Sequence, residues 1–154
     1  MGLDMYLNKK TYVQRWKHTE PEKLYTVDVL RGGKPVPHIK SERIKYVIEE
    51  AAYWRKANHI HQWFVSNVQN GVDECQTSYV SSSKLRELLG VCKQVVQYPS
   101  LATELLPTQG GFFFGSTEYD EGYFDDVKET ITMLEAILSE EGAETSDYEY
   151  HASW

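Results

Sequence analysis

The chain has 154 residues, of which 41% are hydrophobic, 13% aromatic and 25% charged, as is typical of one globular domain. This composition excludes a disordered tail, a collagen-like rod and a disulfide scaffold, and no apolar run reaches the roughly 18 residues of a membrane helix. The net charge of -7 argues against a general nucleic-acid binder.

The charge is unevenly distributed along the chain. Residues 1–56 hold 12 basic and 7 acidic side chains, whereas residues 57–154 hold 4 and 16. The two parts could neutralise each other within a chain or across a homo-oligomer. The alternatives are a basic anion-binding surface, or an acidic surface that meets a basic protein.

The cysteine content and the N-terminus indicate where the protein resides. Cys75 and Cys92 are the only cysteines, which fits a reducing compartment. The start of the sequence has no basic region followed by an apolar one, so we expect no signal peptide and no membrane association. We therefore expect a cytoplasmic protein.

The predicted elements of the first third are two strands and a turn. Alternating apolar residues predict a half-buried strand from residue 3 to 7, and residues 24–30 resemble a second strand. Gly32 and Gly33 predict a tight turn at residues 31–34.

Helical spacing dominates the rest of the chain. It predicts a long helix over 41–68, a second helix from 82 to Pro99, a short helical turn at 101–106, and a last helix from 117 to about 138. Residues 112–114 resemble a strand between glycines. We therefore expect one α+β domain over 1–140, with a small, mostly antiparallel sheet on the long central helix and two further helices, followed by a flexible acidic tail at 141–154.

The first candidate site lies where the inward stripe of the long helix becomes polar. Arg55, Asn58 and Gln62 replace apolar residues there, with Trp54 and His61 at the border. Burying such groups without partners costs several kcal/mol. Three arrangements would avoid that cost: an internal ion pair of Arg55 with Glu118 or Asp120, a polar ligand pocket, or a helix exposed on that side.

The second candidate site is the glycine-rich segment 107–120, which leads into a predicted helix N-terminus. Free backbone N–H groups favour anions there, but Glu118 and Asp120 would repel a phosphate. Phe113 could stack on a base. The two sites together give these candidate ligand-binding residues: Trp54, Arg55, Asn58, His61, Gln62, Thr108, Gln109, Phe113, Ser116, Glu118 and Tyr119.

The sequence contains no established catalytic or metal-binding signature. His59 and His61 would diverge on a helix and could not easily share one ion, so we expect no metal and no cofactor. Glu118 with His61 and Arg55 is the one combination to test as catalytic. Residues 117–149 hold 12 acids and one base, which suits either a solvated face or a mimic of nucleic-acid phosphates.

Three segments together resemble a family of small bacteriophage and prophage proteins. They are MGLDMYL at 1–7, YWRKANHIHQWFV at 53–65 and LLPTQGGFFFGSTEYDEGYF at 105–124. The resemblance implies the cytoplasm of a bacterial host, and small phage proteins without enzyme signatures often modulate host machinery or defence.

The resulting expectation is a non-enzymatic, homo-oligomeric phage protein that sequesters a small polar ligand, such as a nucleotide-derived defence signal. Arg55 would bind a phosphate or carboxylate of that ligand. One alternative is an acidic inhibitor that covers the basic nucleic-acid site of a host or defence protein. The other alternative is a nucleotide hydrolase that uses Glu118 and His61.

Overall fold

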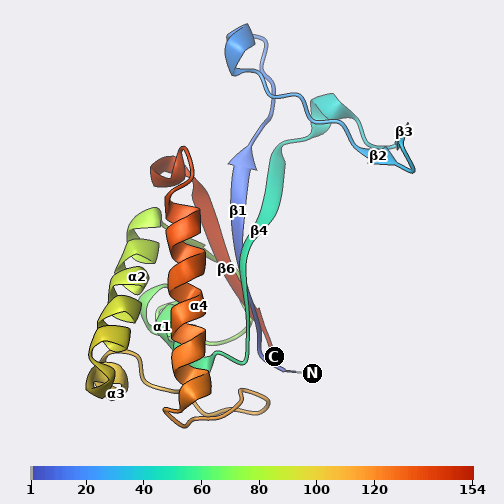
Figure 1. Ribbon diagram of the computed structural model, residues 1–154. Coiled ribbons are helices and arrows are strands. Elements are labelled where there is room, and N and C mark those ends of the chain that lie inside the picture. The colour runs from blue at the N-terminus through green and yellow to red at the C-terminus, as the bar shows by residue number, and fades with distance from the viewer. Residues whose placement is uncertain (1) are drawn as a thin grey trace. The chain divides into compact units, whose positions relative to one another are not determined.

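The computed structural model describes residues 2–154 (Figure 1). Met1, the first residue of the predicted domain and of the first family motif, lies outside the described residues. The chain divides into two compact units, which are described separately below. Unit 1 contains the chain up to Lys9 and all of Glu50–Trp154, and unit 2 is Lys10–Glu49.

The main sheet has four strands in the order β4-β1-β6-β5. Hydrogen bonds from Lys56 N to Leu3 O and from Val13 N to Lys45 O, both 2.8 Å, make β4 antiparallel to β1. The pair β5 and β6 is also antiparallel. The predicted α+β class with a mostly antiparallel sheet is therefore confirmed. The strands are β1 (Asp4–Tyr12), β4 (Tyr46–Arg55), β5 (Ser78–Val80) and β6 (Asp147–Ser153).

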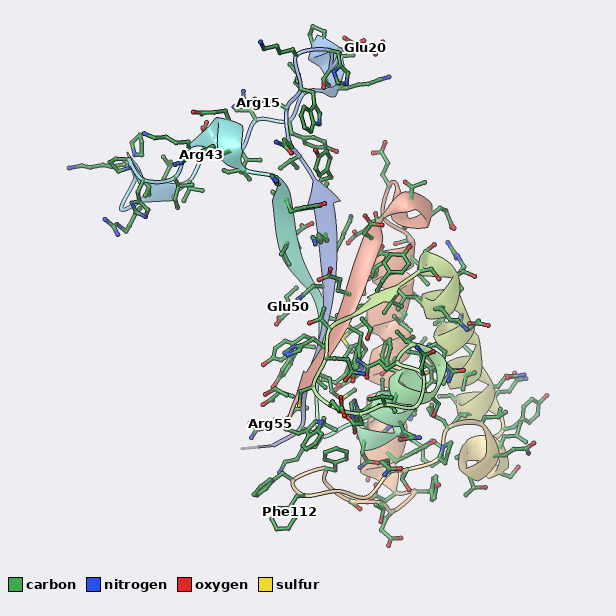
Figure 2. All side chains as sticks on the ribbon, turned by 180° about the vertical axis from the view of Figure 1, so that it is seen from behind. Arg15, Glu20, Arg43, Glu50, Arg55 and Phe112 are labelled. Carbon is green, nitrogen blue, oxygen red and sulfur yellow. The ribbon has the colours of Figure 1, made fainter. Side chains whose placement is uncertain are left out.

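The helices of unit 1 cover one face of this sheet (Figures 1 and 2). They are α1 (Asn58–Asn67), α2 (Ser82–Gln97), α3 (Ala102–Leu105) and α4 (Glu121–Leu138). Short 3-10 turns lie at Pro21–Lys23, Ser41–Arg43, Pro99–Leu101 and Ala143–Thr145. Among residues 2–154, no helix combines the length and the apolar character needed to cross a bilayer.

The core of unit 1 follows the predicted apolar spacing in β1, α2 and α4. Leu3, Met5 and Leu7 are fully buried and alternate with more exposed residues, as expected of a strand with one covered face. Ser81 caps α2 by accepting a hydrogen bond from Lys84 N. The inward residues of the two long helices are Leu85, Leu88, Cys92 and Val95 in α2 and Tyr123, Val127, Thr130, Leu134, Ile137 and Leu138 in α4.

The predicted long helix over 41–68 is wrong for its first half. Residues 46–55 form β4, and only the last part of the segment is helical, as α1. Val47 and Ile48 are β-branched and suit a strand, and pairing with β1 supplies the backbone hydrogen bonds that a helix would otherwise make. Ala52 and Trp54 are the strand's buried residues, with the period of two that a strand requires.

Three further boundaries differ from the sequence prediction. Residues 112–114 are not a strand, because Phe113 and Gly115 have φ values of 64° and 87° and the chain turns there. The last helix begins at Glu121 after the cap residue Asp120, and not at 117. Of the predicted strand 24–30, only Leu30 belongs to a strand, β2.

Residues 141–154 were expected to be a flexible tail, but the structure places β6 there, between β1 and β5. Tyr148, Tyr150 and Ala152 are buried, at 0–2% exposure. Acidic and polar residues alternate with them, as on a strand covered on one face. Because every second residue of this strand is polar or acidic, the average composition of the segment resembles that of a solvated tail.

Unit 2 is built around a small hairpin. Its strands β2 (Leu30–Arg31) and β3 (Lys34–Pro35) are joined by Gly32 and Gly33, with φ values of 60° and 78°. This confirms the predicted tight turn, since two positive φ values are typical of a type I′ turn. Among residues 10–49 only Val13 and Val36 are buried. Trp16 is half exposed and donates its indole N–H to the hydroxyl of Tyr12, at 3.0 Å.

Candidate functional site

A polar cleft of about 280 Å³ lies in unit 1, where β4, α1, the 115–120 loop and the first turns of α4 meet. Its walls carry charges of both signs, with an imidazole and a phenol between them. The lining residues are Arg55, Lys56, His59, Gly115, Ser116, Glu118, Asp120, Gly122, Tyr123 and Asp126.

Arg55 presents its guanidinium at this cleft from the end of β4 (Figure 2). Its side chain is 59% exposed, and its ion-pair partner among residues 2–154 is Asp4, with 4.0 Å between Nε and Oδ1. The proposed internal pairs with Glu118 or Asp120 are absent from the ion pairs of the described chain. An exposed pair this long contributes little, so Arg55 can still donate to an anion.

His59 is the buried polar group of the cleft. It is 3% exposed, its ring lies 4.1 Å from the Tyr123 ring, and its Nε2 has no hydrogen-bond partner among residues 2–154. Burial lowers the pKa of His59 to about 4, and a polar backbone group of Tyr123 offsets this only in part. The imidazole is therefore neutral at pH 7, with an unsatisfied nitrogen, which is unusual for a buried group.

Asp126, in α4, contributes a carboxylate with a raised pKa to the lining of the cleft. Burial, with smaller contributions from Glu129, Asp125 and Asp120, raises the pKa of Asp126 to about 6. Asp120 has a structural role, because its Oδ1 caps α4 by accepting a hydrogen bond from the Tyr123 N–H. A donor group on a ligand, such as an amine or hydroxyl, would relieve the crowding of like charge at Asp126.

A close backbone contact shapes the mouth of the cleft. Gly115 has φ +87°, and a Cβ placed on it would lie 3.1 Å from Lys56 Cβ and 3.3 Å from Lys56 O. Both the conformation and the contact therefore require glycine. Lys56 itself has φ 56° and donates its N–H to Leu3 O, which fixes the chain between β4 and α1.

Asn58 serves the glycine-rich loop and not the open space. Its Nδ2 donates to the carbonyls of Phe114 and Ser116, and its Oδ1 accepts from Gln109 N, all at 2.9 Å. The side chain is 1% exposed. The sequence suggests Asn58 as a ligand-binding residue, whereas in the structure its amide holds the loop that forms one wall of the cleft.

His61 belongs to a buried hydrogen-bonded chain. Its Nδ1 lies 2.7 Å from the Tyr150 hydroxyl and its Nε2 lies 3.0 Å from Asp73 Oδ2, while Trp154 Nε1 donates to Asp73 Oδ1 at 3.0 Å. Burial raises the pKa of Tyr150 well above its usual value, so the phenol beside His61 stays protonated. Both ring nitrogens are thus engaged, and the network joins α1, the 73 loop and β6.

The other predicted site residues are divided among separate places. Trp54 is buried and bonds Thr130, and Gln62 bonds Ser66 beside a second depression. Thr108 and Tyr119 bond each other within the loop. Of the predicted set, the structure brings three residues together at the cleft, namely Arg55, Ser116 and Glu118.

The predicted site set leaves out seven of the ten lining residues, namely Lys56, His59, Gly115, Asp120, Gly122, Tyr123 and Asp126. From the sequence, His59 is interpreted as half of a metal-binding pair with His61, and Asp126 as part of a solvated acidic face or of an acid–base pair with Asp125. The signal that pointed toward them was the polar turn beginning at Arg55, which faces the start of the last helix.

No group of three or more His, Cys, Asp or Glu side chains within residues 2–154 is arranged to hold a metal ion. The chain matches no protein-family profile, no curated protein and no solved structure. The function is therefore argued from the cleft itself.

Proposed function

We propose that this protein binds and sequesters a small polar ligand in the cleft between Arg55 and α4, without transforming it. The observation that carries the proposal is that Arg55 and His59 line the same cleft and neither has a strong hydrogen-bond or ion-pair partner there. Arg55 has only a 4.0 Å contact with a carboxylate, and the buried His59 Nε2 has no partner among residues 2–154. An anion at Arg55 would gain a charge-assisted hydrogen bond, and a ligand group that reached His59 Nε2 would remove the cost of burying that nitrogen without a partner.

The charges of the cleft define the ligand chemistry. An anionic group, a phosphate or a carboxylate, would bind Arg55 and Lys56, which favour charge-assisted hydrogen bonds. Hydroxyl or amino donors would face Glu118 and Asp126. A nucleotide-derived molecule carries both kinds of group, and it is the most concrete candidate. The resemblance to phage proteins supports a defence signal as the biological source.

A hydrolase is less well supported by the geometry. That hypothesis needs His61 as a proton acceptor beside Glu118, but the two nitrogens of His61 are bonded to Tyr150 and Asp73. His59, the imidazole that does line the cleft, is a weak base because burial lowers its pKa to about 4.

Released-ligand analysis tests the proposal. The protein is purified from phage-infected bacteria and denatured, and the supernatant is examined by mass spectrometry. We expect an intact anionic small molecule from the wild type. Arg55→Ala should weaken its binding by roughly 10- to 100-fold, the value of one charge-assisted contact. Lys93→Ala, which removes an equal charge from the exposed Lys93–Glu135 pair, is the matched control.

Two outcomes would contradict this function. One is an empty wild-type protein whose melting temperature is unchanged across a panel of nucleotides and dinucleotides. The other is a ligand that is recovered only as its cleavage product, which would favour the hydrolase.

A further inference from the structure

Unit 2 contains an apolar groove that its own residues do not fill. The groove has a volume of about 340 Å³ and is lined mainly by Val29, Leu30, Pro35, Val36 and Ile39. Leu30 is 58% exposed and Ile39 40%. A 40-residue unit with two buried side chains has no core of its own, and exposed apolar surface on an ordered segment marks a contact site.

The sequence around this groove is mostly basic, although Asp28 is one of the groove's own lining residues. Between residues 30 and 46 the chain carries five basic side chains, Arg31, Lys34, Lys40, Arg43 and Lys45, and one acid, Glu42. The groove therefore suits an apolar side chain that lies next to acidic residues.

Unit 1 presents such a side chain at Phe112. It is 85% exposed, the highest value among the exposed large hydrophobic residues of the described chain, and its ring stands off the loop (Figure 2). Phe113 behind it has φ 64°, an unfavourable backbone for an aromatic residue. Its carbonyl accepts the Leu3 N–H at 3.2 Å. Glu118 and Asp120 follow in the same loop, and Glu121 begins α4.

We propose that unit 2 of one copy binds the Phe112 loop of a second copy of this chain. Phe112 enters the apolar groove, and the acidic residues that follow it face the basic side chains of residues 31–45. The charge balance favours a second copy as the partner: unit 2 holds 9 basic and 5 acidic residues, and unit 1 holds 7 and 18. Each copy supplies a groove and a loop, so the contact is made twice in a two-fold symmetric dimer. Glu118 and Asp120 also line the proposed ligand cleft, but the dimer is measured without ligand, so the two proposals can fail separately.

Sedimentation equilibrium of the full chain tests this interface. We expect a wild-type dimer that weakens as salt is added, since its charged contacts are exposed. Phe112→Asp in the loop and Leu30→Asp in the groove should each raise the dimer Kd by roughly 100-fold or more, as expected when a buried anchor is lost. Phe112→Leu should retain the dimer. Tyr98→Asp is the charge control, because Tyr98 is 54% exposed at the end of α2 and belongs neither to the groove nor to the Phe112 loop.

Mixing the two monomeric variants gives the decisive result. The Phe112→Asp copy has an intact groove and the Leu30→Asp copy has an intact loop, so one of the two contacts can re-form. A heterodimer in the mixture, with neither homodimer present, would support the proposal. A wild-type monomer up to the solubility limit would overturn it, as would a dimer that both variants leave unchanged. A monomer destabilised by both variants would also overturn it, because the contact would then lie within one chain.

Discussion

Asn58 shows how much depends on one buried amide. Its three hydrogen bonds reach Gln109, Phe114 and Ser116, so it connects α1 to a loop without regular secondary structure. Asn58→Ala would remove the partner of the buried Phe114 carbonyl and of the part-buried Ser116 carbonyl and Gln109 N–H. We expect it to lower the free energy of unfolding by about 3 kcal/mol, measured by urea denaturation.

Gln62→Ala is the control for this prediction, because Gln62 makes one exposed bond to Ser66 on the same helix. Its effect should stay near or below about 0.5 kcal/mol. Equal effects of the two substitutions would mean that the loop does not depend on Asn58. Hydrogen exchange should also speed up at residues 109–116 in Asn58→Ala.

Asp126 and His59 predict opposite dependences of stability on pH. The pKa of Asp126 is raised to about 6 in the folded state, so its contribution is lost as pH rises from about 4 to 6. The pKa of His59 is lowered to about 4, so its contribution is lost as pH falls from about 6.5 to 4.

Urea unfolding of two variants between pH 4 and 7 separates these contributions. Asp126→Asn should be more stable than wild type at pH 7, by about 1 kcal/mol after allowance for solvent screening, and equal to it near pH 4. His59→Leu should remove part of the acid sensitivity. If both variants changed the pH slope in the same direction, the assignment of these groups would be wrong.

At the residue scale, the sequence identified the polar turn but not the role of each member. It predicts that Arg55, Asn58 and His61 together bind a ligand. Asn58 finds partners 51 to 58 residues away in the sequence, and His61 finds partners 12 and 89 residues away. Such pairings depend on tertiary packing that local spacing does not encode. Arg55 alone of the three keeps an exposed side chain.

The strand β6 supports an element-scale prediction. Ala152 is 2% exposed on the covered face, and its neighbour Ser153 is exposed. Ala152→Asp would bury a charge in an inner strand, and we expect a loss of about 3 kcal/mol or more. Ser153→Asp should be nearly neutral. Circular dichroism melts compare the two, and similar melting temperatures would mean that the segment behaves as a tail.

The sequence predicts a helix where the structure has β4 and a tail where it has β6, and both predictions are wrong for the same physical reason. In β4, Glu49, Glu50 and Ala51 are good helix formers, and the neighbouring apolar residues also fit a helical stripe. Long-range pairing with β1 decides the structure, and such tertiary context overrides local propensity. By contrast, α2 and α4 were predicted well, because their stripes run for four or more turns and depend little on distant partners.

At the scale of the whole molecule, unit 1 should fold without unit 2. Its core lies in residues 3–9 and 50–154 with few contributions from elsewhere. Replacing residues 10–49 with an Asn-Gly turn, which suits antiparallel strands, should preserve a cooperative thermal transition. A peptide of residues 10–49 should be disordered by circular dichroism, since it buries only Val13 and Val36. An unfolded unit 1 would contradict this prediction.

The four tryptophans offer a spectroscopic consequence of this division. Trp54, Trp63 and Trp154 belong to unit 1, and Trp16 is the single indole of unit 2. Its half-exposed ring lies 6.4 Å from that of His18, stacked at 18°. The emission difference between the wild type and Trp16→Phe therefore reports on unit 2 alone. Quenching of that component by acrylamide would follow events there without an attached dye.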